Sequence, residues 1–349
     1  MSAQSAVVLE QSTGKVLWES NSRQQLGMAS TTKIMTAVVT LEHADPLEFV
    51  TVGKNAAGVE GSSIWLEEGE QLTVEDLLYG LMLNSGNDAA VALAEHIGGT
   101  VEHFCDLMNQ KAQEIGAVNT HFENPNGLPQ DGHYTTAYDL GLIACYALKN
   151  PFFCKIVSTR ETTIAWNGRD YGRKLSNHNK MLRLYEGCDG VKTGFTKSTG
   201  RALVTSATRN GMQVVAVTLN DPDDWRDHTD LLDRAFSEFR KETVLCQGET
   251  VTHAAVQGGK RETCSLMAEE ELALICPKEE QPDVQVKTTI FQADAPISRG
   301  MRLGEAQLYA DGKMIGKTNL LAAESVSSDS WKRYRLTAEQ LLERWMGAR

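Results

Sequence analysis

Hydrophobic residues change their spacing along the chain in a way that separates strands from helices. Two apolar runs rich in β-forming residues flank Gly14 within residues 5–20, which predicts an N-terminal hairpin. A second antiparallel hairpin is predicted where the runs 201–209 and 212–220 flank a tight Asn210-Gly211 turn. Elsewhere apolar residues recur every three or four positions, as on one face of a helix. These helices are predicted over residues 28–39, 74–83, 89–98, 101–116, 137–148 and 225–242.

Short polar motifs mark where two of these helices begin. Thr73 with Asp76, and Thr136 with Asp139, have the spacing of a capping box, in which the threonine hydroxyl accepts a hydrogen bond from a backbone N–H group. The polar stretch that includes residues 62–72 is predicted to hold short strands.

The pattern changes after about residue 242. The segments that follow are predicted to be short strands around turns such as Asp311-Gly312, which indicates a small all-β domain. The last stretch, WKRYRLTAEQLLERWMGAR, has the spacing and charge of a basic amphipathic helix. The predicted organisation is therefore a mixed α/β domain over 1–242, a β-rich domain over 243–328 and an amphipathic helix over 329–349.

Composition and charge narrow the classes of function. The 349 residues are 41% hydrophobic and 23% charged, which is ordinary for a globular chain with ample material for a core. The formal net charge of −12 argues against a nucleic-acid partner, because such a partner requires a basic face. No run is long and apolar enough to span a bilayer, and no secretory signal precedes the first predicted strand.

The cysteines argue against a zinc ribbon and a thioredoxin-type site. None of the seven forms a C-x-x-C pair. An odd, scattered set is typical of buried thiols that behave as small hydrophobic groups, and by itself it favours a reducing environment. We predict no metal site and no cofactor.

A lysine lies where the helix pattern predicts burial. The helix over 28–39 is apolar almost all round, yet it carries Lys33 one turn after Ser30. A serine that caps the helix and a lysine that reaches solvent would explain this pair without any chemistry. The same S-x-x-K spacing also occurs from Ser12 to Lys15, inside the predicted hairpin turn. The pattern alone therefore does not identify a nucleophile.

Two further motifs change this interpretation. The sequence S-G-N at 85–87 falls at a break between two predicted helices, where a loop can aim its side chains. The sequence K-T-G at 192–194 lies at the start of the predicted sheet. Each motif alone fits an ordinary turn or strand end. In the order S-x-x-K, S-x-N and K-T-G, however, the three form the set that marks penicillin-recognising serine enzymes.

A resemblance to a known family extends well beyond these motifs. The segments that carry it are MASTTKIMTAVVTLE, GSSIWLEEGEQLTVEDLLYGLMLNSGNDAAVALAEHIGG, HFENPNGL, HYTTAYDLGLIA and CDGVKTGFTKSTGRALVTSATRNG. Over roughly residues 5–242 the chain resembles the D-alanyl-D-alanine carboxypeptidases, which are low-molecular-mass penicillin-binding proteins of the bacterial envelope. The β-rich segment after it resembles the second domain of that family. The resemblance implies an α/β (α+β) fold whose antiparallel sheet has helices on both faces, as in serine β-lactamases.

The family implies a serine-type carboxypeptidase that needs no cofactor. Such an enzyme would remove the terminal D-alanine from peptidoglycan stem peptides ending in D-Ala-D-Ala, through an acyl-enzyme on Ser30, and β-lactam antibiotics would acylate the same serine. A serine hydroxyl needs a nearby base, and no Ser-His-Asp arrangement is apparent. Lys33 shares a helix face with Ser30. Burial and a second ammonium group, that of Lys192, would both lower the pKa of Lys33 toward the range of a base.

The remaining roles follow from the resemblance. Ser85 would relay protons to the leaving D-alanine nitrogen, and Asn87 would bind the substrate amide and orient Lys33. Backbone N–H groups of Ser30 and Phe195 would form the oxyanion hole. Family members often carry histidine where this chain has Phe195. The carboxylate of the substrate would be held by Lys192, Thr193 and Gly194, with help from Arg226.

Two other functions share parts of this pattern. A class A β-lactamase has the same serine, lysine and K-T-G motif, but it also needs a glutamate base in an E-x-x-x-N loop. The nearest match here is ETTIAWN, at 161–167, whose context is strand-like. A penicillin-sensing receptor domain or an inactive scaffold would be acylated with hardly any turnover. A receptor is usually tethered to a transmembrane segment, and none is apparent.

The expected substrate also predicts where the chain acts. Peptidoglycan lies outside the cytoplasmic membrane, so we expect export to the outer face of that membrane, with the signal peptide absent from this sequence. The tail helix combines an apolar stripe with basic residues, as do helices that lie in a membrane interface. Packing of the stripe on the β-rich domain or on a second copy of the chain is the alternative. The stripe consists of Ala338, Leu341, Leu342 and Trp345.

Overall fold

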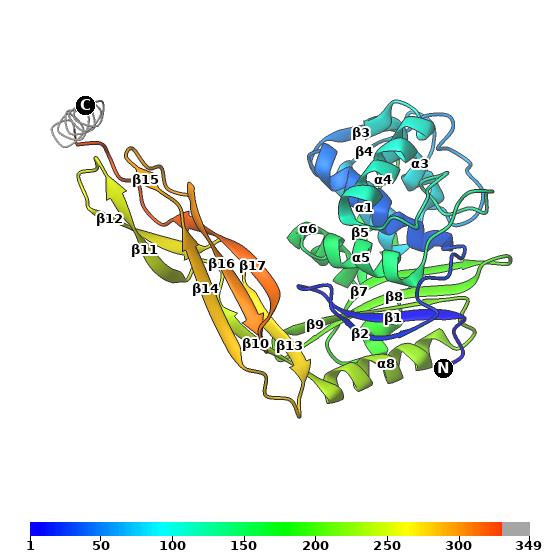
Figure 1. The fold of residues 1–349 in the computed structure, drawn as a ribbon. Helices are drawn as coiled ribbons and strands as arrows, with labels where there is room; N and C mark the ends of the chain where they lie inside the picture. The colour runs from blue at the N-terminus through cyan, green and yellow to red at the C-terminus, as the bar shows by residue number, and fades with distance from the viewer. Residues whose placement is uncertain (330–349) are drawn as a thin grey trace, which may run out of the picture. The chain divides into compact units, whose positions relative to one another are not determined.

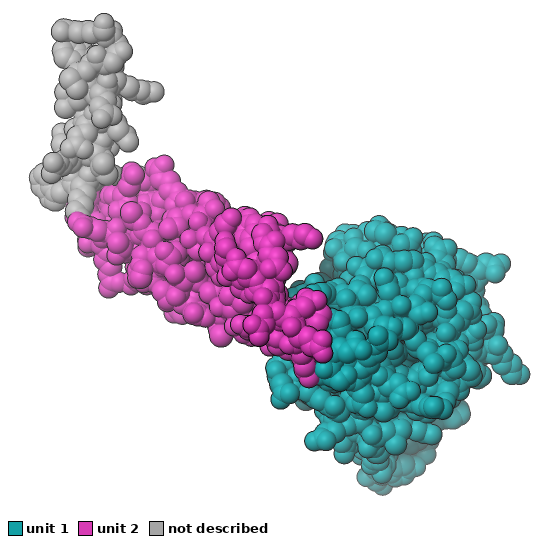
Figure 2. All heavy atoms as spheres, turned by 60° about the horizontal axis from the view of Figure 1, so that its bottom comes forward, with its two compact units in different colours: residues 1–239 teal, residues 240–349 magenta. Residues whose placement is uncertain are grey.

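The computed structural model describes residues 1–329, which divide into two compact units (Figure 2). The first unit is Met1–Phe239, and the second begins at Arg240. The tail helix predicted over 329–349 falls outside the described residues apart from its first position. Within residues 1–329, no single helix combines the length and hydrophobicity that a membrane span requires.

A five-stranded antiparallel sheet forms the centre of the first unit (Figure 1). Its strands are β1 Ser5–Glu10, β2 Val16–Ser20, β7 Cys188–Thr196, β8 Gly200–Arg209 and β9 Met212–Leu219. Their order is β2-β1-β9-β8-β7, so the N-terminal hairpin joins the later strands through β1 and β9. Asn210 and Gly211 have φ angles of 51° and 77°, which fit the tight turn predicted between β8 and β9. Both predicted hairpins are confirmed.

Helices cover both faces of this sheet, which confirms the expected α/β architecture (Figure 1). They are the 3₁₀ turn η1 Ala29–Thr32 and the helices α1 Lys33–His43, α2 Val74–Leu83, α3 Asn87–Gly98, α4 Val101–Ile115, α5 Ala137–Ala147, α6 Pro151–Ser158, α7 Met181–Leu184 and α8 Asp224–Glu238. Helix α8 packs against one face of the sheet, while α5 and α6 pack against the other. Two short strand pairs lie among the helices: β3 Phe49–Thr51 with β4 Gln71–Thr73, and β5 Glu161–Ile164 with β6 Arg173–Ser176.

Local signals located the helix starts better than some helix ends. The hydroxyls of Thr73 and Thr136 accept the backbone N–H groups of Asp76 and Asp139, both at 3.1 Å, so both predicted caps are confirmed. The helix predicted to reach 242 instead ends at Glu238, because the chain continues directly into a strand.

Two other expectations also differ from the structure. The helix predicted over 28–39 begins as the 3₁₀ turn η1, and residues 62–70 form a loop rather than strands.

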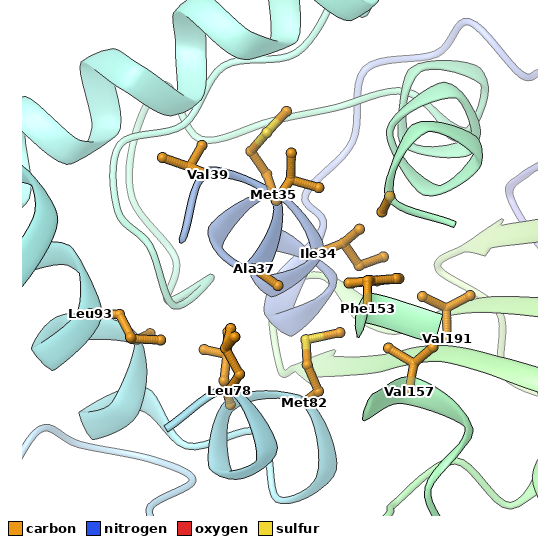
Figure 3. Close-up of a cluster of buried hydrophobic side chains, with 14 of the residues drawn as sticks. Ile34, Met35, Ala37, Val39, Leu78, Met82, Leu93, Phe153, Val157 and Val191 are labelled. Carbon is orange, nitrogen blue, oxygen red and sulfur yellow. The ribbon is translucent and has the colours of Figure 1, made fainter. Parts of the chain in front are cut away.

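Helix α1 runs through the middle of the main hydrophobic core. Figure 3 shows its side chains in one cluster with residues of α2, α3, α6 and β7. The residues labelled there are Ile34, Met35, Ala37, Val39, Leu78, Met82, Leu93, Phe153, Val157 and Val191. Fully burying an aliphatic side chain stabilises the fold by about 1.5–3 kcal/mol. Packing of its buried residues, Lys33–Thr40, therefore fixes the position of α1 and of Lys33 at its start.

The second unit contains only strands among its described residues. They are β10 Phe239–Leu245, β11 Thr250–Gln257, β12 Thr263–Ala268, β13 Leu272–Pro277, β14 Val284–Ile290, β15 Ala293–Asp294, β16 Arg302–Ala310 and β17 Lys313–Ala322. Six form a sheet of order β14-β16-β17-β12-β11-β15, and β10 pairs with β13. The predicted Asp311-Gly312 turn joins β16 to β17. The unit has its own core, which includes Leu266, Leu308 and Leu320.

The cysteines are all free thiols. All seven lie within residues 1–329; four are buried, two are half-buried and Cys246 is exposed. Burial raises the pKa of the Cys105 thiol to about 12. The expectation of buried thiols therefore holds for most of the set.

Candidate active site

The three sequence motifs meet in the first unit. The turn η1 and helix α1 supply Ser30 and Lys33, the break between α2 and α3 supplies Ser85 and Gly86, and Asn87 begins α3. Strand β7 supplies residues 192–195. Together with neighbouring segments they border a cavity of about 330 Å³. Its lining residues are Ser30, Ser62, Ser85, His178, Lys180, Thr193, Gly194, Phe195, Arg201, Asp224 and Trp225.

The amine of Lys33 has three hydrogen-bond partners. Its Nζ lies 3.0 Å from Ser30 Oγ and 2.7 Å from Asn87 Oδ1, and it also donates to the backbone carbonyl of Asn126. The last two partners are carbonyl oxygens, which can only accept. In a neutral amine they would occupy both N–H groups, and the lone pair would then face the hydroxyl of Ser30.

Burial makes the neutral form of Lys33 accessible. Its side chain is fully buried, and this desolvation lowers its pKa well below the usual value. The positive charge of Lys192 lowers the pKa of Lys33 further, while Asp88 opposes both effects. Burial alone lowers the pKa of Lys192 to about 7. The shift predicted from the apolar helix and the second ammonium group is thus confirmed in direction and in both causes.

Ser85 forms a second serine–lysine pair. The Nζ of Lys192 donates to Ser85 Oγ at 3.1 Å and to the carbonyl of Thr193 at 2.8 Å. Ser85 has a left-handed backbone, with φ of 60°, which is uncommon for a residue other than glycine. The turn is stabilised by the N–H of Gly86, which donates to the Gly80 carbonyl at 3.0 Å. Strained backbone of this kind is typical of functional sites.

The glycine of the K-T-G motif permits a close approach of two backbones. A Cβ atom on Gly194 would lie only 3.1 Å from the backbone nitrogen of Ser30. The N–H groups of residues 30 and 195 therefore belong to two segments that pack backbone to backbone. The side chain of Phe195 is 64% exposed, so only its backbone belongs to this contact.

Asp88 organises the cavity wall and was not identified from the sequence. It is fully buried, and its carboxylate accepts hydrogen bonds from Ser63 Oγ and from the backbone N–H groups of Ile64 and Leu66. These contacts anchor the loop that carries Ser62 to the start of α3, next to Asn87. The only local signal was an acidic residue in the first turn of a helix, which usually stabilises the helix dipole.

The predicted arginine is not among the residues that line the cavity. The side chain of Arg226 is 76% exposed, and its Nε lies 4.0 Å from Asp230 on the same helix. Arg201, which was not predicted, borders the cavity instead. It pairs with Asp224 at 2.9 Å and lies directly opposite Phe195 in the β7–β8 pairing. The β7–β8 pairing that places Arg201 there was not among the predicted hairpins, so no signal in the sequence identified this residue.

The second S-x-x-K segment, at Ser12, and the ETTIAWN segment, at 161–167, both lie in ordinary β-hairpins. Ser12 lies in the β1–β2 turn, where its hydroxyl donates to the Glu10 carboxylate at 2.8 Å. Glu161, the glutamate of ETTIAWN, lies in strand β5 and pairs with Lys174 and Arg183, both at 3.2 Å. The glutamate of this segment therefore lies in a strand and not in the loop that a class A β-lactamase needs. Among residues 1–329, no group of three or more potential metal ligands is found.

Comparison with known proteins decides the family. Residues 1–223 match the family model of D-alanyl-D-alanine carboxypeptidase. The chain belongs to the D-alanyl-D-alanine carboxypeptidase family. Residues 239–328 of the carboxypeptidase match a second model, that of the penicillin-binding protein 5 C-terminal domain. It is thus a serine-type DD-carboxypeptidase with the second domain that its sequence resembled.

Similar proteins cover nearly the whole carboxypeptidase. D-alanyl-D-alanine carboxypeptidase DacF of Bacillus subtilis is 37% identical over 335 residues, which is 93% of this chain and 86% of the relative. Penicillin binding protein 5 from Haemophilus influenzae has a TM-score of 0.72 at 31% identity, covering 94% of this chain and 98% of that one. The peptidoglycan synthesis regulatory factor PBP3 from Streptococcus pneumoniae has a TM-score of 0.76 at 27% identity, covering 94% and 100%. Neither the β-lactamase nor the sensor alternative is favoured by these relatives.

Proposed function

We propose that the chain removes the terminal D-alanine from peptidoglycan stem peptides ending in D-Ala-D-Ala, through an acyl-enzyme on Ser30. One observation carries this assignment: a buried lysine amine contacts the hydroxyl of Ser30, and both of its other partners are hydrogen-bond acceptors. Such an amine can accept the proton of the hydroxyl as its oxygen attacks a carbonyl.

Acylation begins with proton transfer from Ser30 to neutral Lys33. The Oγ atom attacks the carbonyl carbon of the penultimate D-alanine, and the carbonyl oxygen becomes an oxyanion. The backbone N–H groups of Ser30 and Phe195 stabilise that oxyanion, and no side chain is needed at position 195 for this role. We therefore expect phenylalanine to be compatible with activity where related enzymes often carry histidine.

Collapse of this intermediate breaks the peptide bond. The leaving D-alanine nitrogen takes a proton that originates on Lys33 and passes through the hydroxyl of Ser85. Asn87 holds Lys33 and also binds the amide of the substrate. Water then attacks the ester, again with Lys33 as the base, and releases the shortened peptide. β-Lactams acylate Ser30 in the same way.

The carboxylate of the substrate requires a cationic subsite. Thr193 and Gly194, on β7, line the cavity, and the amine of the adjacent Lys192 donates to Ser85, which lines it too. We give the supporting role to Arg201 rather than to Arg226, because the guanidinium of Arg201 borders the cavity and that of Arg226 points to solvent. Lys192 and Arg201 would together neutralise the carboxylate.

The substrate implies a location. We propose that the chain acts after export, on the outer face of the cytoplasmic membrane. Its relatives support this location, because they are penicillin-binding proteins of the cell envelope. We further propose peripheral membrane contact through the helix predicted over 329–349. The basic amphipathic pattern of that segment supports this contact.

Peptide turnover tests the proposed activity. Purified chain incubated with diacetyl-L-Lys-D-Ala-D-Ala is expected to release D-alanine over many cycles, while a β-lactam is hydrolysed only slowly. A single turnover that ends in a stable acyl-enzyme would favour a sensor. Rapid hydrolysis of the β-lactam without peptide hydrolysis would favour a β-lactamase.

A further inference from the structure

Three aromatic residues, on two segments joined by Arg173, are not among those that line the catalytic cavity. Trp65 is 72% exposed and Tyr171 is 60% exposed. Trp166 packs edge-to-face on Tyr171, with ring centroids 5.8 Å apart. We call Trp65, Trp166 and Tyr171 the aromatic shelf. Exposed aromatic groups of this kind are typical of binding surfaces.

The backbone holds Trp65 outward against its own preference. Its φ angle is +63°, a left-handed value that is a genuine outlier for a bulky residue. Ser63 Oγ accepts the N–H of Trp65 at 2.8 Å, and Arg173 Nη2 donates to its carbonyl at 3.2 Å. The neighbouring residues are tied to Asp88. A strained backbone that presents an exposed indole indicates function.

A buried ion pair joins the two segments of the shelf. Arg173, on β6, pairs with Glu70 at 3.1 Å, and both side chains are only 4% exposed. The same guanidinium that reaches the carbonyl of Trp65 lies 4.7 Å from the ring centre of Trp166. One buried cation therefore holds both the backbone of Trp65 and the ring of Trp166, although the two residues are far apart in the sequence.

The shelf begins at the wall of the catalytic cavity. Ser62 lines that cavity, and its carbonyl accepts the backbone N–H of Asn87 at 2.7 Å. Trp65 is three residues farther along the chain, a span of at most about 10 Å. A substrate bound at Ser30 thus needs to extend only a short way to reach the shelf.

We propose that the aromatic shelf binds sugar rings of the glycan strand that carries the stem peptide; this inference rests on the proposed function. Indole and phenol rings offer flat apolar faces to the C–H faces of a sugar, and their edges tolerate water. Polar groups on both segments can meet hydroxyl and acetamido groups, among them Glu67 and Arg169, whose side chains lie 3.9 Å apart. A stem peptide separates the sugar from the scissile bond by a few residues of about 3.3–3.6 Å each, so the sugar of a bound substrate would lie beyond the residues that line the cavity.

Two substrates that differ only in the sugar test this proposal. D-Alanine release is measured from a disaccharide-pentapeptide and from the same pentapeptide without sugar. Trp65→Ala is expected to raise KM for the disaccharide substrate about tenfold, or about 1.4 kcal/mol of binding free energy, and to leave KM for the free peptide within about twofold. Tyr171→Ala is expected to act in the same direction. Leu47→Ala removes another exposed apolar side chain, 71% exposed in the same unit, and is expected to change neither.

A second readout separates this inference from the proposed activity. Ser30→Ala is expected to bind a peptide-free oligosaccharide of N-acetylated amino sugars with a change in tryptophan fluorescence, and Ser30→Ala with Trp65→Ala is expected to bind it more weakly. Equal KM changes on both substrates, or no change on either, would overturn the shelf. Loss of the reaction with fluorescent penicillin in Trp65→Ala would mean that this substitution disturbs the active site itself. The KM values of Tyr171→Ala then test the aromatic shelf. Failure of the wild-type chain to cleave either peptide would instead refute the proposed activity.

Discussion

The Nζ atom of Lys33 lies 3.0 Å from Ser30 Oγ, at the start of a helix whose first eight residues are all buried. Asn87 and the Asn126 carbonyl occupy the remaining hydrogen-bonding directions of the amine, so its lone pair has one partner when it is neutral. The apolar helix contributes to this arrangement, because the packing that excludes water also lowers the pKa of Lys33 and favours its neutral form.

The base role predicts that Lys33→Arg is almost inactive, although the positive charge is retained. An arginine side chain stays protonated at every working pH and cannot accept the proton of Ser30. We expect peptide hydrolysis to fall about 100- to 10,000-fold, the usual contribution of a positioned base. Lys15→Arg, in the second S-x-x-K segment, is the matched control and should keep the wild-type rate. Near-normal hydrolysis by Lys33→Arg would rule out the base role.

The pH dependence of acylation should report the neutral amine. Below the pKa of Lys33 the amine is protonated, so the rate of acylation by penicillin should fall about tenfold per pH unit. Lys192 lowers the pKa of Lys33, so Lys192→Gln should raise that pKa and move the acid limb to higher pH. Rate–pH profiles of the two proteins check this shift. An acid limb that stays in place would mean that the two lysines are not electrostatically coupled.

Arg201 and Arg226 are predicted to differ in their effect on substrate binding. Arg201→Ala should raise KM for a D-Ala-D-Ala peptide about 10- to 100-fold, because a hydrogen bond to a charged group contributes about 1.5–3 kcal/mol. Arg226→Ala should leave KM within about twofold, since its exposed pair with Asp230 contributes little. Steady-state kinetics on one peptide compares both variants. A larger KM increase in Arg226→Ala than in Arg201→Ala would show that Arg226 binds the carboxylate of the substrate.

The tail is predicted to bind membranes weakly and reversibly. A few apolar side chains at about 1.5–3 kcal/mol each provide the attraction. Anionic lipid should strengthen it and salt should weaken it. Co-sedimentation with liposomes compares the full chain with a version that ends at Ser330. Equal partitioning of the two at low salt, with anionic lipid present, would show that the tail is not an anchor.

Local features of the fold were predictable from the sequence. The Asn210-Gly211 turn and the caps at Thr73 and Thr136 depend on residues within a few positions of each other, so their patterns specify them directly. The pairing of β1 with β9 has no such local signal, because it joins the two ends of the first unit. The end of α8 at Glu238 was also missed, because the next residue, Phe239, begins β10, which pairs with the distant strand β13.

In the candidate site, too, the residues of local motifs could be predicted, and those placed only by the folded chain could not. Ser30, Lys33 and the two later motifs are short patterns whose order is informative, and the structure brings them together through hydrogen bonds beside one cavity. Arg201 belongs to no motif, and only its register opposite Phe195 places it at the cavity. Asp88 is missed for a different reason. Its role depends on three donors from residues 63–66, which reach it only in the folded chain.

Covalent labelling of Ser30 tests the central claim most directly. Intact-mass spectrometry after addition of a β-lactam compares the wild-type chain with Ser30→Ala and with the matched variant Ser12→Ala. The wild-type chain and Ser12→Ala are predicted to gain the mass of one β-lactam, and Ser30→Ala is predicted to gain none and to release no D-alanine from the peptide. A Ser30→Ala chain that is labelled as fully as the wild type would contradict the assignment of Ser30 as the nucleophile.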